Sequence, residues 1–492
     1  MMRRTFASPI IAALAVTALT TPAGAAPFEK SGIADWTRPP EPGPEPRFTP
    51  PVAQRSQLGN QLSVLIVENH TLPIVAIDLV VPGAGAAADP MHRGGLAAFT
   101  ADLLDEGAGG RSAIELAEDQ RLLGARITTR VDADAAYISA SALTRTLDPT
   151  LDLFARILTQ PAFGDDDVAR VKGDRVTELR QRRDRPREVA SNVLAEALFG
   201  RDSGYGHPET GVVVDAEAIS AADVRSFYRG HWNPRRMTIV VVGDVSPPAV
   251  IAKLEAALGA WRTSDALPPG RPTSAPPTPA PRLLLVDRPG AAQSDVRIGT
   301  IGPARSDPRF HAFEVLRNIA GGGFTGRVTQ RLREQLGIIY HASTDIDWRV
   351  APGPFVIGAG IATPETATGI SEVFKILDDV ATNEAPAAEL DKAKLNLVRA
   401  LPDKFATNAA TAATFAELAL LHLPDDWYAG FADGVRRVTA ADVKAAGKVT
   451  LTSGKMSVSI VGDLAKIRPA IDKLGLGAAI PYSLDGIALP AK

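Results

Sequence analysis

The sequence predicts an α+β protein built from two homologous domains, each a mostly antiparallel sheet packed with helices. With 492 residues the chain is too long for a single core. Runs of β-branched residues alternate with long helical stretches, in a mixed order that includes hairpin-like strand pairs. The same order of elements then recurs in the second half. A content of 45% hydrophobic and 22% charged residues is that of an ordinary globular protein.

The duplication is clearest at the ends of the two halves. The first half closes with "SAADVRSFYRGHWNPRRMTIVVVGDVS" and the second with "TAADVKAAGKVTLTSGKMSVSIVGDLA", so that Asp223 corresponds to Asp442. The openings of the two halves match through Asp89 and Asp307, each of which is followed by proline. The separation of these two residues in the sequence is almost the same as that of Asp223 and Asp442. A repeat that spans nearly half of the sequence indicates domain duplication rather than a solenoid.

Within each half the elements follow one order. Two strands come first, as in "VAIDLVV", and a helix follows the Asp-Pro pair. A helix and further strands come next, as in "ARITTRVDADAAYISASAL", then long helices and a closing strand, "MTIVVVGD" or "MSVSIVGD". Ser220 and Thr439 are suited to cap the penultimate helices, because each has an acidic residue three positions later.

The N-terminus has the layout of a secretory signal. Arg3 and Arg4 precede an apolar run, residues 10–19, and Ala23-Gly24-Ala25 follows, which predicts cleavage after Ala25. An uncleaved anchor is the alternative, although the run is too short to span a bilayer stably. The chain has no cysteine, which is compatible with export to a bacterial periplasm and excludes disulfides, thiolate metal sites and a cysteine nucleophile.

Two proline-dense stretches divide the rest of the chain. "DWTRPPEPGPEPRFTPP" is suited to an extended segment, and the seven prolines of "TSDALPPGRPTSAPPTPAPR" to a stiff linker. The predicted organisation is a signal at 1–25, a proline-rich extended segment at 26–52, an N-terminal domain at 53–262, the linker at 263–282, a C-terminal domain at 283–475 and a tail at 476–492. A net charge of −3 does not indicate a nucleic-acid partner, and we expect no membrane span after signal removal.

The helix in "GGLAAFTADLLDEGAGG", residues 94–110, contains the first candidate site. Its apolar positions at helical spacing should be buried on one face: Leu96, Phe99 and Leu103. The opposite face carries Ala98, Ala101, Asp102 and Asp105.

This stretch resembles the first helix of the insulinase/pitrilysin-like zinc metallopeptidases, the inverzincins, which carry His-x-x-Glu-His after Gly-Leu-Ala. The resemblance implies the metallohydrolase fold of mitochondrial processing peptidase. It places the two ligand histidines on Ala98 and Asp102 and the general base on Ala101. Glu178, further along the chain near the family's third-ligand position, is a remnant of that ligand or a solvated carboxylate. Alanine has no donor atom and one aspartate cannot replace two imidazoles and a base, so we expect no metal and no cofactor in this chain.

The duplicate of this helix contains a second possible metal site. His311 and Glu314 in "RFHAFEVLRN" have the i, i+3 spacing of a ligand pair. Because no second histidine follows at a suitable distance, a surface contact is the favoured interpretation.

The second candidate site is "GGGFTGRVTQRLREQLGIIYHAST", residues 321–344. Three glycines, Gly321, Gly322 and Gly323, should end a helix and leave backbone exposed. A helix from Arg327 to about Gln335 is expected next, with Arg327 and Arg331 on one face and Arg333 pointing elsewhere. From the pattern alone this is a solvated basic helix followed by a tyrosine at the edge of the core.

The resemblance gives this segment a role, because the family's C-terminal domain supplies an arginine and a tyrosine to the peptide cleaved in the facing domain. "RLREQLGIIY" resembles that element and implies Arg331 and Tyr340 as the catalytic pair, with Arg327 as the alternative arginine and the three glycines in substrate binding. Larger members have tyrosine where this chain has Ile338. Positions 338 and 340 should face the same side of a strand, so the phenol still reaches the same cavity.

The expected function is therefore that of an accessory subunit in a heterodimeric zinc peptidase. The zinc and its His-x-x-Glu-His motif are expected in a homologous partner subunit, and the substrates are peptides. A tyrosine O–H and a guanidinium aimed at the carbonyl oxygen stabilise the negative charge that develops when water attacks. The alternative is a catalytically inactive protein that binds peptides or scaffolds an envelope complex, as do the inactive core subunits of mitochondrial respiratory complexes, which resemble this family.

Overall fold

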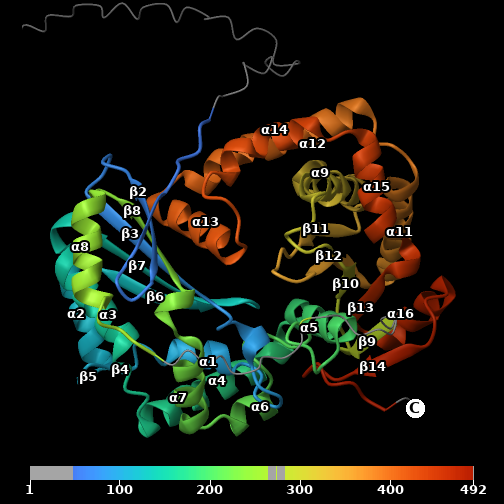
Figure 1. Cartoon of the computed structure of the whole chain (residues 1–492). Coiled ribbons are helices and arrows are strands. Elements are labelled where there is room, and N and C mark those ends of the chain that lie inside the picture. Colours follow the sequence, from blue (N-terminus) through green and yellow to red (C-terminus); the bar gives the residue numbers. More distant parts are fainter. Residues whose placement is uncertain (1–47, 264–272, 274–282, 491–492) are drawn as a thin grey trace, which may run out of the picture. The chain divides into compact units, whose positions relative to one another are not determined.

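Two six-stranded sheets, each packed against helices, form the fold (Figure 1). The computed structural model describes residues 48–263, 273 and 283–490. The predicted α+β class with two homologous domains is confirmed. The predicted signal at 1–25, most of the proline-rich segment and most of the linker lie outside the described residues. None of the described helices is long and apolar enough to cross a membrane.

The first sheet is formed by β1 (Gln54–Gln57), β2 (Ser63–Glu68), β3 (Ile74–Pro82), β6 (Arg126–Val131), β7 (Ala135–Leu143) and β8 (Thr238–Gly243). Their order across the sheet is β1-β2-β8-β3-β7-β6. β2 and β8 run parallel, and the other neighbouring pairs are antiparallel. A separate ribbon pairs β4 (Gly107–Ala108) with β5 (Arg111–Ser112).

The second sheet is formed by β9 (Leu283–Asp287), β10 (Gln293–Ile301), β11 (Ile339–Ile346), β12 (Pro354–Ala362), β13 (Ser457–Gly462) and β14 (Ala479–Tyr482). Their order is β11-β12-β10-β13-β9-β14. β9 runs parallel to β13 and to β14, and the other pairs are antiparallel. β14 comes from the segment expected to be a tail, and it completes one edge of this sheet.

The helices of the first half are α1 (Leu96–Asp102), α2 (Ala113–Leu123), α3 (Leu147–Thr159), α4 (Asp165–Gln181), α5 (Pro186–Phe199), α6 (Val213–Ala218), α7 (Ala221–His231) and α8 (Pro247–Leu258). Side chains of α1, α3, α7 and α8 form one core with the sheet residues Val64, Ile77 and Ile239.

The helices of the second half are α9 (Phe310–Gly321), α10 (Arg327–Thr329), α11 (Thr366–Thr382), α12 (Ala387–Ala400), α13 (Asn408–Leu420), α14 (Phe431–Arg437), α15 (Ala440–Thr450) and α16 (Leu464–Ile471). Phe313 of α9 and Leu377 of α11 are fully buried in one core with Ile298 of β10.

The two halves repeat in register. β3 and β10, β7 and β12, and β8 and β13 have equal lengths within each pair, and the same stretch of chain separates the start of one strand from the start of its counterpart in all three pairs. The predicted caps are confirmed, because Ser220 and Asp223 form a capping box at α7, and Thr439 and Asp442 form another at α15.

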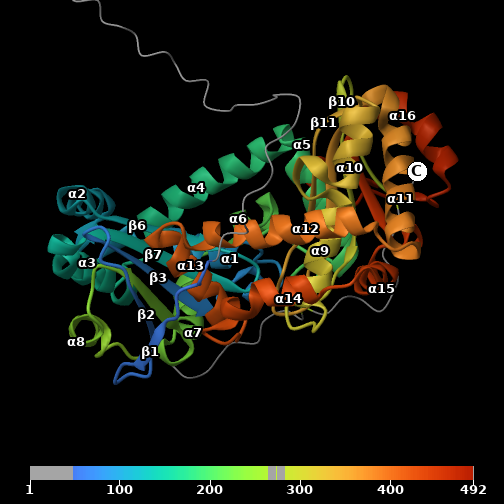
Figure 2. The ribbon, with the colours of Figure 1, turned by 90° about the horizontal axis from the view of Figure 1, so that it is seen from above.

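Each half contributes one helix to the sheet of the other half. α5 packs on β10 and β13, whereas α13 packs on β3 and β8 (Figures 1 and 2). Leu194 of α5 is buried beside Leu284 and Val461, and Phe415 of α13 belongs to the same core as Ala76 and Val240. Both sheets are therefore covered on both faces, which explains why central strands such as "TIVVVG" are apolar without alternation.

Candidate functional site

The first helix of the first half, α1, is closely surrounded. Leu96, Phe99 and Leu103 are buried as predicted. Ala98 and Ala101, expected on the opposite face, are buried as well, with exposures of 7% and 1%. Only the end of the helix, at Asp102, reaches solvent.

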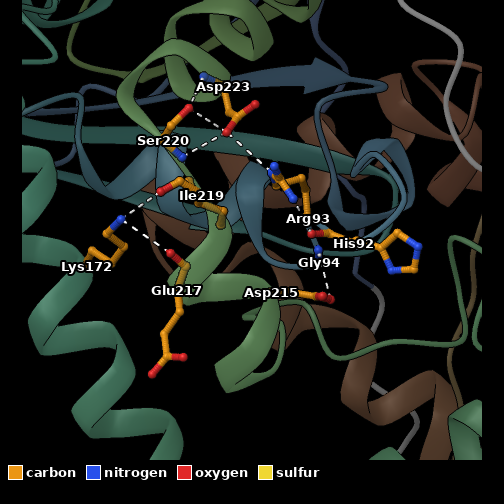
Figure 3. Close-up of polar contacts among 9 residues, drawn as sticks. All are labelled: His92, Arg93, Gly94, Lys172, Asp215, Glu217, Ile219, Ser220 and Asp223. Carbon is orange, nitrogen blue, oxygen red and sulfur yellow. Dashed lines mark hydrogen bonds and ion pairs between the residues drawn. The ribbon is translucent and has the colours of Figure 1, made fainter.

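The start of α1 is fixed by hydrogen bonds from several directions. The carboxylate of the buried Asp89 accepts from the N–H groups of Gly95 and Ala97 at 2.6 and 2.7 Å, which satisfies two of the free donors at a helix N-terminus. Asp215 of α6 accepts from Gly94 N, and Asp223 of α7 contacts Arg93 (Figure 3).

The same junction holds α4 in place. Lys172 of α4 donates to the carbonyl oxygen of Ile219 at 2.9 Å, directly before the cap of α7 (Figure 3). α1, α4, α6 and α7 are thereby joined around the position that corresponds to the zinc site of the resembled peptidases.

A charge pair stands at that position. Arg175 of α4 donates to the carboxylate of Asp102, and its side chain is only 7% exposed. Its Nη1 also donates to the carbonyl oxygen of Thr210 at 3.4 Å. Glu178 lies one turn further along α4 and is exposed.

These residues do not fit a zinc ion. Ala98 and Ala101 offer no donor atom, and the guanidinium of Arg175 already occupies the carboxylate of Asp102. A divalent cation added beside a buried guanidinium would be repelled by it. Over the described residues no group of three or more histidine, aspartate or glutamate side chains gathers as a metal site. The absence of zinc from the protein stays a prediction.

His311 and Glu314 have separate structural partners. The His311 ring stacks on Trp427, with centroids 5.7 Å apart and an interplanar angle of 6°. Glu314 is buried, accepts from Trp348 Nε1 at 2.8 Å and pairs with Arg317. The two side chains serve the packing around α9, which is an interior role rather than the expected surface contact.

The arginine and tyrosine segment begins with a tighter glycine turn than expected. Gly321 is buried, and a Cβ atom there would lie 1.9 Å from Thr344 Oγ1. Gly323 has a φ of +63°, a conformation that favours glycine. The expectation of exposed backbone therefore holds for Gly323 and fails for Gly321. The proposed contact of these glycines with substrate stays a prediction.

The predicted helix is present, but it begins as an α-helix and continues as a π-helix. α10 continues into a π-helical segment, Gln330–Gln335, in which Leu336 N donates to Arg331 O five residues earlier. Arg327 pairs with Glu389 and Asp379, which ties α10 to α12 and α11.

Arg331 faces α11 as Arg327 does. Its Nε donates to Glu372 at 2.7 Å, and its Nη1 donates to Gln335 at 2.9 Å. Both arginines named from the sequence are therefore held by carboxylates of neighbouring helices.

The arginine beside Tyr340 is Arg333, which points away from the face of Arg327 and Arg331, as predicted. Its guanidinium carbon lies 5.5 Å from the centre of the Tyr340 ring and 5.1 Å from that of Phe324. Tyr340 is 86% exposed and Phe324 69% exposed, so the guanidinium lies between two solvent-facing rings. The closeness of Arg333 and Tyr340 along the chain was the only sequence signal for this pair.

Tyr340 owes its exposure to an irregularity at the start of β11. The pairing of β11 with β12 shifts between Ile339 and Ala342, and the two intervening residues, Tyr340 and His341, are both exposed. Ile338 precedes the strand and packs against the core of the second half. The expectation that positions 338 and 340 share a face is therefore wrong.

Two cavities adjoin this region. One of about 250 Å³ is lined by Tyr340, His341 and Ser343 of β11 together with residues of β10, β12 and α5. The other, of about 590 Å³, shares Ser343, Arg187 and Arg297 with the first and extends to the loop around Tyr205.

That loop joins the two halves. Tyr205 is buried and its hydroxyl donates to Asp134 at 2.5 Å. The same carboxylate accepts from Val350 N at 2.9 Å, and the Tyr205 oxygen accepts from Ala351 N at 3.3 Å. The loop acts as a structural connection between the first half and the turn before β12.

Comparison with known proteins identifies the architecture. The profile described as "Insulinase (Peptidase family M16)" matches residues 63–205, and "Peptidase M16 inactive domain" matches residues 218–397. The chain belongs to the insulinase family, peptidase family M16. The second match shows that this M16 chain carries a domain of the family's inactive type.

Similar proteins agree with this assignment. An "uncharacterized zinc protease" of Streptomyces coelicolor is 28% identical over 302 residues, which cover 59% of this chain and 64% of that protein. The matched part thus spans less than two thirds of that relative. The crystal structure of a peptidase M16 inactive domain from Pseudomonas fluorescens superposes with a TM-score of 0.76 at 25% identity, covering 83% of this chain and 98% of that one. A protease from Helicobacter pylori shares the fold, with a TM-score of 0.76 at 18% identity over 84% of this chain and 99% of that one.

Proposed function

We propose that this M16 chain is the accessory subunit of a two-subunit zinc peptidase. In this proposal a homologous partner subunit carries His-x-x-Glu-His and the zinc ion, and the present chain supplies Tyr340 and an arginine to the same peptide. The observation that carries the proposal is a contrast between two positions. A charge pair, Arg175 with Asp102, stands where water would be activated, whereas Tyr340 is 86% exposed beside a cavity.

The chemistry required of this chain is oxyanion stabilisation. When water attacks a peptide carbonyl, negative charge develops on the carbonyl oxygen, and donors aimed at that oxygen stabilise the transition state. The exposed Tyr340 hydroxyl and the half-buried Arg333 guanidinium beside it are the donors that support this role, and in this proposal Arg333 takes the part expected of Arg331 or Arg327. Arg333 contacts the carboxylate of Glu334 at 3.5 Å, whereas Arg327 and Arg331 would have to give up shorter pairs, at 2.6 and 2.7 Å, with Glu389 and Glu372 to act there.

A reconstitution experiment tests the proposal. The purified chain should hold no stoichiometric zinc and leave unstructured peptides intact, and a homologous subunit with His-x-x-Glu-His should restore chelator-sensitive cleavage. Tyr340→Phe in the pair should lower kcat by about 100-fold while peptide binding persists, because one oxyanion donor is lost. Chelator-sensitive cleavage by the isolated chain would disprove the proposal. Unchanged turnover with Tyr340→Phe would favour the alternative, a peptide-binding or scaffolding pseudopeptidase.

We also propose that the protein is exported to the bacterial periplasm. The arginines, the apolar run and the Ala-Gly-Ala sequence of residues 1–25 support this location. N-terminal sequencing of the protein recovered from a periplasmic extract should begin at Ala26. Recovery of the full-length chain from the cytoplasm would contradict it.

A further inference from the structure

The cavity of about 250 Å³ beside Tyr340 contains two arginines from different halves of the chain. Arg297 lies on β10 of the second sheet, and Arg187 lies in the first turn of α5, the helix that the first half contributes to that sheet. Both side chains also line the cavity of about 590 Å³. The packing of α5 on β10 thus brings two positive charges to the place where the cavities meet.

Arg297 is held rigidly and is 5% exposed. Its Nε donates to Ser191 Oγ at 3.0 Å, its Nη1 to Val296 O at 2.8 Å and its Nη2 to Arg187 O at 3.5 Å. A guanidinium has five N–H groups, so two of them have no acceptor among the described residues. Burial, followed by the charge of Arg187, lowers the pKa of Arg297 to about 10.

A glycine on the neighbouring strand makes room for the side chain of Arg297. In the sheet Arg297 pairs with Gly358 of β12, which in turn pairs with Ser343 of β11. A Cβ atom at position 358 would lie 2.8 Å from Arg297 Nη1. Glycine at this position allows the guanidinium to lie flat along the sheet and leaves the cavity open above it.

Arg187, one of the two arginines of this cavity, forms no ion pair with a carboxylate of the described residues. Its side chain is exposed. The acidic residue of the cavity lining is Asp295, which is 7% exposed, and Arg297 acts on it more strongly than Arg187 does. In the lining of the cavity of about 250 Å³, two arginines stand against one aspartate. Asp345, which lines the larger cavity, also acts on Arg297, so the exposed positive charge without an ion pair beside Tyr340 is that of Arg187.

We propose that Arg187 and Arg297 form a binding site for a carboxylate group of the peptide substrate. The paired N–H groups of a guanidinium match the two oxygens of a carboxylate, and a buried, immobile arginine loses little entropy on binding. A carboxylate held there fixes the position of the peptide relative to Tyr340. The site deepens the proposed function and rests on its peptide-binding part, but it does not require the partner subunit.

The test measures peptide binding by the isolated full chain at near-physiological salt, by fluorescence anisotropy. The first pair of peptides has one sequence without acidic residues, made once with a free C-terminal carboxylate and once as the C-terminal amide. The second pair consists of two C-terminal amides that differ at one internal position, which is glutamate in one peptide and glutamine in the other. In one of the two pairs, the wild type should bind the peptide with the carboxylate about tenfold more tightly than its neutral counterpart. A difference within the first pair would show that the site binds a C-terminal carboxylate. A difference within the second pair would show that it binds an acidic side chain.

Variants show whether the discrimination comes from this site. Arg187→Gln, a change on the surface, should reduce the affinity for the carboxylate peptide to that of its neutral partner, and Arg187→Lys should keep part of the difference. Arg185→Gln removes the same charge two residues away, outside both cavities, and should keep the whole difference.

Two results would overturn the site: equal affinities within both peptide pairs, or an equal loss with Arg185→Gln. A third result is that the two subunits together do not cleave peptides while the isolated chain still binds carboxylate peptides more tightly than neutral ones. That result would disprove the proposed function but support the carboxylate site.

Discussion

The guanidinium of Arg175 lies against the carboxylate of Asp102, which is the one polar side chain at the two histidine positions and the glutamate position of the His-x-x-Glu-His frame in α1. The contact joins residues that are distant in the sequence, on α1 and α4. A protein cation thus pairs with the carboxylate that stands at one of the two histidine positions of that frame. Removing Asp102 would leave the guanidinium of Arg175, whose side chain is 7% exposed, without its carboxylate partner, so the pair contributes to the fold.

Arg175→Met should lower the free energy of unfolding by about 2 kcal/mol, because hydrogen bonds to Asp102 and Thr210 are lost and the carboxylate is left unpaired. Urea denaturation followed by circular dichroism measures the change. The matched control is Arg180→Met on the same helix, where Arg180 and its partner Glu217 are 60% and 52% exposed. That exposed pair should be worth less than about 1 kcal/mol. Equal losses for the two variants would contradict a special role for Arg175.

The sequence is sufficient to single out the segment of residues 321–344 but not to predict which of its arginines lies beside Tyr340. Helical spacing at about 3.6 residues per turn predicts Arg327 and Arg331 on one face and Arg333 on another, and the structure agrees, but the spacing does not show which face lies beside Tyr340. The π-helical segment turns less per residue, and the shift in β11 then exposes two consecutive residues, Tyr340 and His341. Neither irregularity leaves a periodic signal in the sequence.

Arg333→Lys in the reconstituted pair should lower kcat by about tenfold or more with a small change in KM, because lysine keeps the charge but loses the planar donor pair. Arg331→Lys serves as the matched control, since its contact with Glu372 is retained as a simple ion pair. Steady-state kinetics on an unstructured peptide distinguish the two. A loss confined to Arg331→Lys would return the role to the arginine that the sequence first suggested.

The fold could be predicted further than the site. The internal repeat and the capping residues Ser220 and Thr439 predict strands and helices that the structure reproduces. The exchange of α5 and α13 could not be predicted, because an apolar helix face shows that a helix is buried but not which sheet buries it. Leu194 of α5 has the same apolar character whether it covers the first sheet or the second.

Leu194→Ala should weaken the second domain although the residue belongs to the first half of the chain. Leu194 is 1% exposed, and a cavity left by its side chain should cost about 3 kcal/mol. Hydrogen exchange followed by mass spectrometry should show faster exchange in β10 and β13. Leu254→Ala in α8, which lies in the first half's own core, is the control and should act on β2 and β8. Faster exchange confined to the first sheet in both variants would contradict the exchange of helices.

Asp78 on β3 should make stability depend on pH in an unusual direction. It is 4% exposed, and burial raises its pKa from 3.8 to about 6, although Ser139 donates a hydrogen bond to it at 3.1 Å. The folded state therefore holds this proton more tightly than the unfolded state. The contribution is present in full below pH 3.8 and is lost as the pH rises through 6.

Asp78→Asn removes that ionisation while keeping the size of the side chain and an acceptor for Ser139. The variant should match the wild type near pH 3.5 and exceed it at pH 7.5 by about 2 to 3 kcal/mol, since one pKa unit corresponds to about 1.4 kcal/mol. Urea denaturation at a series of pH values measures the difference, and the exposed Asp152→Asn should follow the wild-type curve. A wild type more stable than Asp78→Asn at pH 7.5 would mean that the carboxylate has a stabilising partner in the folded state, because only such a partner reverses the sign of the burial effect.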